Sequence, residues 1–259
     1  MRTARRIGVA SAKGSPGSTT IALGLALAVA RRGRQVLLVE ADASGGSLVA
    51  RLGLEPTPGL ISLAAAGRHG LSAELLADHV RALGPGVAVL AAPSDPRQVR
   101  ATLDSIGPAL ADALGGLADD TDVVVDLGRL GAEPAAPLAA CLETVIWATP
   151  PTLEGTDALA VRLGPSGLAP RSVVVAVGEG PYDPEEIATA LGLSLLGALP
   201  TDPAGALRLR SGVDAAMLWR SPLGRGLARL ADSVLPPAPV IEPVVTRRTI
   251  RRLTQAVAR

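Results

Sequence analysis

Short, uninterrupted apolar runs recur along the chain and constrain its fold more than any other feature. They cover residues 7–10, 36–39, 87–91, 123–125, 144–148, 173–177 and 195–199. A strand with one solvated face would alternate apolar and polar residues, so continuous runs predict strands buried on both faces of a parallel sheet. The core must consist mainly of aliphatic side chains and alanine, because the 259 residues include no Phe, one Tyr and two Trp.

Helical patterns separate most of these runs and cover residues 19–32, 72–83, 97–113, 155–163 and 184–191. Strand, helix and strand in this rhythm imply right-handed crossovers. The sequence therefore predicts an α/β fold, a three-layer, doubly wound and mostly parallel sheet, in one domain over residues 1–235. A helix over 221–235 closes the domain, with Ser221 as its N-cap. Residues 236–245 follow as a proline-rich linker, and residues 246–259 as a basic tail.

Composition argues against several classes of protein. The net charge of +1 predicts no general attraction to nucleic acid or to an anionic membrane. The one cysteine, Cys141, cannot form an intramolecular disulfide, which fits a reducing cytoplasm. No segment fits a signal peptide or a membrane span, since the most apolar helical pattern, residues 20–30, is too short to cross a bilayer. We therefore expect a cytoplasmic protein.

The stretch SAKGSPGSTT, residues 11–20, lies between the first apolar run and the first helical pattern. A glycine loop in this position can wrap phosphate groups with backbone N–H groups and with the N-terminus of the helix. Gly14, Gly17 and Thr19 match the backbone and hydroxyl positions of a phosphate loop. Ser18 stands where such a loop has its lysine, so the strict Walker A pattern is not met.

The same loop contains the one lysine of the chain, Lys13, against 24 arginines. A compact ammonium group on a flexible stem binds differently from a planar guanidinium. The simplest reason for a lysine at this position is that its ammonium group is required there.

Residues 13–20, KGSPGSTT, resemble the deviant Walker A motif of the ParA/MinD ATPases, Lys-Gly-Gly-x-Gly-Lys-(Thr or Ser)-Thr. Lys13 matches the signature lysine of that family and Thr19 its Mg²⁺-binding hydroxyl, whereas Ser15 and Ser18 depart from the motif. The resemblance implies a P-loop NTPase fold with ATP and Mg²⁺ as cofactors. It implies a phosphate-binding loop made of Gly14, Ser15, Pro16, Gly17, Ser18, Thr19 and Thr20.

Later segments resemble the same family in the expected order. Residues 36–48, VLLVEADASGGSL, resemble switch I, in which Asp42 would orient the attacking water. Residues 121–131, TDVVVDLGRLG, resemble the Walker B strand and switch II. The resemblance implies Asp42 and Lys13 as catalytic residues, with Mg²⁺ held directly by Thr19 and through water by Asp42 and Asp126. Glu40 either replaces the first aspartate of switch I or is a solvated charge at a strand end.

Residues 89–96 and 187–203 resemble the corresponding segments of the CpaE and TadZ branch of this family. In relatives the loop after the last strand borders the adenine, which implies that Pro200 and Asp202 contact the nucleotide here. An asparagine that often reads the base in relatives has no match, because Gly178 and Glu179 follow the preceding apolar run.

The function that the resemblance implies is a protein that dimerises on binding ATP and positions or partitions a larger assembly, such as a septum, a chromosome or a pilus or secretion machinery. In the family, the lysine corresponding to Lys13 reaches the partner subunit's nucleotide. Two alternatives stay open: a pseudo-ATPase scaffold that keeps the fold without turnover, and a P-loop enzyme that acts on a phosphorylated small molecule.

Ser18 removes a positive charge that the hydrolysis of ATP would use. A charge-assisted hydrogen bond is worth roughly 1.5–3 kcal/mol, and stabilisation of developing charge dominates phosphoryl transfer. Three outcomes are open. Mg²⁺ and the loop amides hold ATP unaided, a nearby arginine such as Arg129 replaces the charge, or the site is inactive.

The tail over residues 246–259 places four arginines beside apolar residues at helical spacing. A basic amphipathic helix of this kind binds anionic membrane surfaces, which would put the protein at the inner face of the cell membrane. An unstructured basic tail is an equal alternative, and non-specific DNA contact through the arginines is a third.

Overall fold

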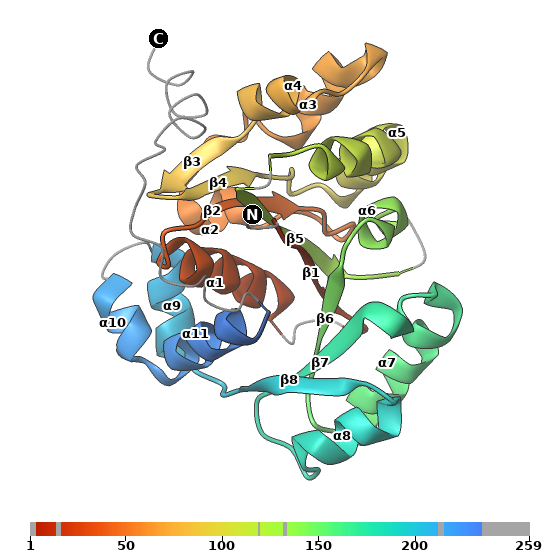
Figure 1. Cartoon of the computed structure of the whole chain (residues 1–259), viewed down its shortest axis with the longest axis vertical. Coiled ribbons are helices and arrows are strands. Elements are labelled where there is room, and N and C mark those ends of the chain that lie inside the picture. Colours follow the sequence, from red (N-terminus) through yellow and green to blue (C-terminus); the bar gives the residue numbers. More distant parts are fainter. Residues whose placement is uncertain (1–3, 14–16, 119, 132–133, 212–214, 235–259) are drawn as a thin grey trace.

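The protein is described by a computed structural model for residues 4–13, 17–118, 120–131, 134–211 and 215–234. Its strands are β1 (Arg6–Ser11), β2 (Gln35–Glu40), β3 (Arg81–Gly84), β4 (Val87–Leu90), β5 (Thr121–Arg129), β6 (Thr144–Thr149), β7 (Ser172–Val177) and β8 (Ser194–Leu199). They form one sheet in the order β3-β4-β2-β5-β1-β6-β7-β8 (Figure 1). Every neighbouring pair is parallel except β3 with β4. The predicted α/β fold with a mostly parallel sheet is therefore confirmed.

Helices cover both faces of the sheet (Figure 1). One face packs against α1 (Ser18–Ala30), α2 (Leu48–Leu52), α9 (Pro203–Ser211), α10 (Ala215–Arg220) and α11 (Pro222–Val234). The other face packs against α3 (Leu60–Ala66), α4 (Ala73–Asp78), α5 (Pro96–Gly115), α6 (Ala136–Ala140), α7 (Leu153–Ser166) and α8 (Pro184–Leu191). Short 3₁₀ turns lie at Gly67–His69 and Ala169–Arg171. The three layers of the prediction are thus present.

The two helical layers explain why the strand sequences are continuously apolar. In β2, Val36 and Leu38 pack into the core beneath α1, while Leu37 and Val39 pack into the core on the α5 side. Because successive side chains point to opposite faces and both faces are covered, a polar residue in the middle of such a strand would be buried.

One predicted helix is wrong in its second half. The pattern over residues 72–83 predicts a single helix, but α4 ends at Asp78 and residues 81–84 form the edge strand β3. The chain then turns through Gly84 and Gly86, both with positive φ, and β3 pairs antiparallel with β4. The pairing is a hairpin whose partners lie close in the chain, from Gly84 with Val87 to Arg81 with Val89. The helical periodicity hid it, and the glycines at 84 and 86 were the local signal of its turn.

The closing helix is confirmed as α11. Its predicted N-cap is also confirmed, because the Ser221 Oγ accepts a hydrogen bond from the Gly224 amide at 3.1 Å. The linker over 236–245 and the basic tail over 246–259 lie outside the described residues and stay predictions. Within the described ranges, no helix is both long enough and apolar enough to cross a bilayer.

A buried ion pair joins two strand starts at the edge of the sheet opposite the strand carboxyl ends. Both Nε and Nη2 of Arg34 donate to the carboxylate of Asp122, whose side chain is fully buried. The backbone amide of Arg5 donates to Asp122 Oδ1 at 2.9 Å. The carboxylate therefore holds the chain before β1 and the chain before β2 against β5.

We expect Asp122→Ala to lower the free energy of unfolding by about 3–5 kcal/mol, because it leaves the Arg34 guanidinium without its buried partner. The measurement is urea denaturation of both proteins. Glu143→Ala is the matched control, since Glu143 pairs with Arg5 near the surface, and it should cost less than about 1 kcal/mol. Equal losses in the two variants would contradict this assignment.

Candidate functional site

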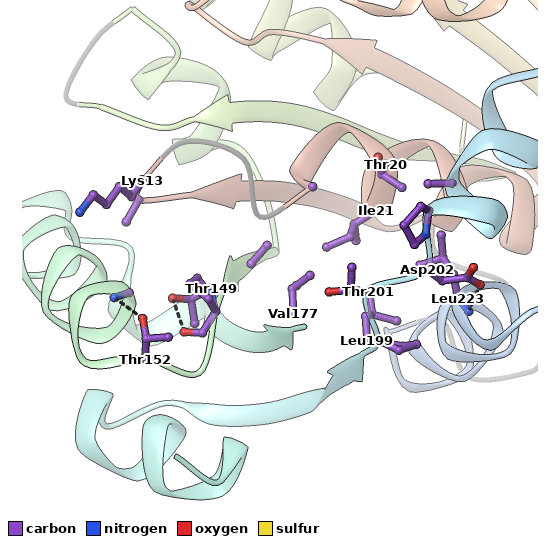
Figure 2. Close-up of a pocket in the computed structure, with 18 of the residues that line it drawn as sticks. Lys13, Thr20, Ile21, Thr149, Thr152, Val177, Leu199, Thr201, Asp202 and Leu223 are labelled. Atoms are coloured by element: carbon purple, nitrogen blue, oxygen red, sulfur yellow. Dashed lines mark hydrogen bonds between the residues drawn. The ribbon is translucent and has the colours of Figure 1, made fainter. Parts of the chain in front are cut away.

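A cavity of about 510 Å³ opens where the parallel strands end (Figure 2). Apolar side chains form much of its wall, among them Ile21, Val177, Leu199 and Leu223. These residues come from α1, β7, β8 and α11. Since all strands of this part of the sheet run in one direction, their carboxyl ends meet here, as in other open α/β sheets that bind ligands.

The loop between β1 and α1 borders this cavity. Gly17 has φ 91° at the N-cap of α1, a conformation that favours glycine. Ser18 and Thr19 are buried at the start of α1, and Thr20 lines the cavity. Lys13 is exposed, and Figure 2 shows it extending away from Thr20 and Ile21. The other predicted phosphate-binding residues, Gly14, Ser15 and Pro16, lie outside the described residues.

Asp126 of β5 is fully buried and only partly satisfied. Its Oδ1 accepts a hydrogen bond from the Gly128 amide at 3.0 Å. Its Oδ2 accepts none from the part of the chain that the structure describes. Burial raises the pKa of Asp126 to about 7, although the Thr19 hydroxyl and the Gly128 amide act in the opposite direction. An unsatisfied buried carboxylate oxygen is costly, and a proton, a water molecule or a bound cation at this position would lower that cost.

Asp42 lies beside Asp126 at the end of β2. Its Oδ1 accepts a hydrogen bond from the Ser44 amide at 2.8 Å. Gly128, with φ 55°, passes so close that a Cβ at this position would overlap the Asp42 carboxylate. The charge of Asp42 also contributes to the raised pKa of Asp126. The fold thus brings Thr19, Asp42 and Asp126 together from three separate segments.

Glu40 is a buried anchor and not a solvated charge at a strand end. Only 1% of the residue is exposed. Its carboxylate accepts hydrogen bonds from the amides of Ser47 at 2.5 Å, Leu48 at 2.9 Å and Ala92 at 3.0 Å. Burial raises the pKa of Glu40. The side chain therefore ties the segment that carries Asp42 to the end of β4.

Pro200 and Asp202, which the resemblance implies as nucleotide contacts, line the cavity, and the Asp202 carboxylate already has partners within the protein. It accepts hydrogen bonds from the amides of Gly205 at 2.8 Å and Leu223 at 3.1 Å. The Gly205 amide is the main reason that the pKa of Asp202 lies below its usual range. Asp202 thus shapes the cavity by joining the starts of α9 and α11.

The sequence interpretation missed polar residues that follow β6. Thr149 and Thr152 line the cavity (Figure 2). The Thr152 Oγ1 accepts a hydrogen bond from the Gly155 amide at 3.2 Å and so caps α7. Their position directly after an apolar run could have identified them, because every strand of a parallel sheet ends at the same edge.

The side chains present are of the kind that Mg²⁺ uses. Magnesium prefers oxygen ligands and usually shares one or two protein side chains with phosphates and water. The Thr19 hydroxyl and the unpartnered Oδ2 of Asp126 are oxygen atoms of this kind, and they lie next to the glycine-capped start of α1. The cavity beside them offers an apolar wall with a few polar groups, which suits a heterocyclic base.

No family model matches the sequence, and no functionally curated protein matches it either.

Several solved structures match the fold over most of both chains. A ParA family ATPase from Chlorobium tepidum has a TM-score of 0.72 at 19% identity, covering 88% of this chain and 99% of its own. The septum site-determining protein MinD of Pyrococcus horikoshii, complexed with Mg-ADP, has a TM-score of 0.70 at 23% identity, covering 90% and 97%. A McdA variant of Cyanothece in complex with ATP has a TM-score of 0.68 at 15% identity, covering 93% and 100%. The chain therefore has the fold of the ParA and MinD ATPases.

Proposed function

We propose that this protein binds ATP with Mg²⁺ in the manner of the ParA and MinD ATPases, dimerises around the nucleotide and positions a larger assembly. One observation carries the proposal. The buried Asp126 keeps an oxygen free of hydrogen bonds from the described residues, beside Thr19 at the start of α1. A buried carboxylate oxygen without a hydrogen bond fits a protein in which a bound cation, together with the phosphates of a nucleotide, interacts with that oxygen.

Each part of the site has a role in this proposal. The loop over residues 14–20 and the N-terminus of α1 bind the phosphates, while the cavity at Pro200 and Asp202 takes the base. Thr19 would hold Mg²⁺ directly, and Asp42 and Asp126 would hold it through water. When bound, the ion neutralises phosphate charge. Asp42, half-buried against Gly128, orients the attacking water.

Ser18 favours slow turnover over fast turnover. It is buried at the first position of α1 and brings no charge to the phosphates. The lost charge matters more for the transition state than for the ground state, because phosphoryl transfer depends on stabilising developing charge. A scaffold that binds ATP with little or no hydrolysis is therefore the second candidate function.

Lys13 favours a role outside its own cavity. Its side chain is exposed and points away from Thr20 and Ile21 (Figure 2). In the proposal it reaches the nucleotide of a second copy, so that ATP joins two subunits. The assembly that the dimer positions is a septum, a chromosome or a pilus or secretion machinery, as for relatives such as the septum site-determining MinD. Residues 246–259 would contact the anionic inner face of the cell membrane.

We expect Thr19→Ala to weaken binding of a fluorescent ATP analogue in Mg²⁺ by about tenfold or more, because one oxygen ligand is lost. Titration followed by fluorescence anisotropy measures the effect. Thr121→Ala is the matched control, since Thr121 is also a buried threonine but lies at the first residue of β5, away from the candidate site at the carboxyl end of that strand. If the wild-type protein shows no binding at millimolar concentration, the proposal is wrong.

Asp126→Asn is expected to stabilise the ligand-free protein while abolishing Mg²⁺-dependent nucleotide binding. The pKa of Asp126 is about 7 in the folded protein, and about 3.9 is expected in the unfolded chain. Between these values only the folded state keeps the proton, so the wild type loses stability as the pH rises from about 4 to about 7. The variant should therefore gain about 1–4 kcal/mol near pH 8 and little near pH 4. Urea denaturation at both pH values measures this, and an equal gain at both would contradict it.

ATP and Mg²⁺ should convert the wild type from monomer to dimer in sedimentation equilibrium. Lys13→Ala should bind ATP but stay monomeric, because the missing ammonium group would act across the interface. Arg68→Ala, which removes another exposed cation, is the control and should still dimerise. A wild type that binds ATP and remains a monomer would refute dimerisation while leaving nucleotide binding intact.

A further inference from the structure

A second cavity, of about 390 Å³, lies on the other side of Lys13 from the apolar cavity. Four cationic side chains line it: Lys13 after β1, Arg100 on α5, Arg129 at the end of β5 and Arg162 on α7. No carboxylate of the described residues lines it. We call it the arginine cavity.

The charges in the arginine cavity are not neutralised by the protein. Within the described ranges, the side chains of Lys13, Arg129 and Arg162 make neither an ion pair nor a hydrogen bond. Arg100 donates from Nε to the backbone carbonyl of Ala43 at 3.1 Å, which does not neutralise its charge. Like charges gathered around one cavity repel one another, and a bound anion relieves that repulsion.

The arginine cavity adjoins the proposed metal site. Ala43 and Ser44, which line it, directly follow Asp42, and Arg129 directly follows Gly128. Asp42 packs against Gly128, so the residues that follow each of them, Ala43 and Arg129, lie near one another in the cavity wall. Arg129 also pairs with Ser11 across β5 and β1, which places it beside the strand that leads into the phosphate loop.

The two cavities share a wall at Ala12 and Lys13. One is apolar and suits a base, and the other is cationic and suits phosphate. A ligand with a base in the first cavity and its phosphates along the loop beside Thr19 and Asp126 would direct its last phosphate toward the second. Guanidinium groups bind phosphate oxygens in pairs, which a serine at position 18 cannot do.

We propose that the arginine cavity is a phosphate-binding site in which Arg100, Arg129 and Arg162 supply the positive charge that Ser18 does not. Its ligand is the terminal phosphate of the nucleotide or, as the second source of the same chemistry, free phosphate. The inference rests on the proposed function for the first source only. Under it, the protein distinguishes ATP from ADP through arginines beyond Asp42.

Calorimetric titration of the full-length protein in Mg²⁺ tests this with three ligands: a non-hydrolysable ATP analogue, ADP and inorganic phosphate. The variants are Arg129→Gln and Arg162→Gln, whose exposed side chains leave the core unchanged. Arg97→Gln is the matched control, because Arg97 lies one turn before Arg100 on α5, pairs with Asp95 and does not line the cavity. Circular dichroism confirms that each variant is folded.

The wild type should bind the ATP analogue at least about tenfold more tightly than ADP, the value of one charge-assisted hydrogen bond. Arg129→Gln and Arg162→Gln should each bind the analogue about tenfold more weakly than the wild type does, and their affinity for ADP should be unchanged. Arg97→Gln should bind all three ligands as the wild type does. A different result would support free phosphate as the ligand: the wild type binds ADP and the analogue with equal affinity, and the variants lose binding of inorganic phosphate.

Binding of all three ligands that is unchanged in both variants would overturn the inference and leave the proposed function standing. Failure of ADP and the analogue to bind the wild type would overturn the proposed function. In that case the titration with inorganic phosphate alone tests whether the arginine cavity binds phosphate. Phosphate binding by the wild type that Arg129→Gln and Arg162→Gln abolish would support the inference, and no phosphate binding by the wild type would refute it.

Discussion

Parallel pairing of β1 with β5 and β6 is the constraint on which the rest of the structure depends. It aligns the central strands in one direction, so that Ser11, Glu40, Arg129 and Thr149 all end strands at one edge of the sheet. Both faces are covered by helices, which leaves this edge as the place where loops from distant parts of the chain meet. The start of α1, the Asp42 segment and the arginine cavity all lie there for this reason.

Three buried acids on β2 and β5 differ in their hydrogen-bond and ion-pair partners. The difference distinguishes the two acids that hold the fold together from the one that is available to a ligand. Asp122 has a guanidinium and a backbone amide. Glu40 has three amides. Asp126 has one amide, and its second oxygen is left without a partner among the described residues. The unsatisfied acid lies at the candidate site, which is where a fold that holds a ligand would tolerate the cost of burial.

Positive charge around the site is distributed unusually for a phosphate loop. The start of α1 carries Ser18, whereas Lys13, Arg100, Arg129 and Arg162 line the arginine cavity together with Ala43 and Ser44, which follow Asp42. A charge beside the β phosphate would hold di- and triphosphates similarly, whereas the proposed arginine cavity would bind the last phosphate of a triphosphate only. In this proposal the protein hydrolyses ATP slowly, because Ser18 carries no charge, and it distinguishes ATP from ADP through the arginine cavity.

The sequence by itself determined the layered α/β fold, the order of its central elements and the glycine at the start of the first long helix, because continuous apolar runs and glycine placement are local signals of buried strands and tight turns. It also singled out Lys13, Thr19, Asp42 and Asp126. Only the tertiary structure decided that Glu40 is an anchor, that the Asp202 carboxylate holds two helices and that residues 81–84 form an edge strand. It alone brought Arg100 and Arg162 to one cavity. Some partners are distant, such as the Ala92 amide for Glu40 and the Leu223 amide for Asp202, and others are near, such as Val87 for Gly84. In each case the pattern of apolar and polar residues does not encode which amide, strand or charge a residue will meet, because the tertiary fold sets that geometry.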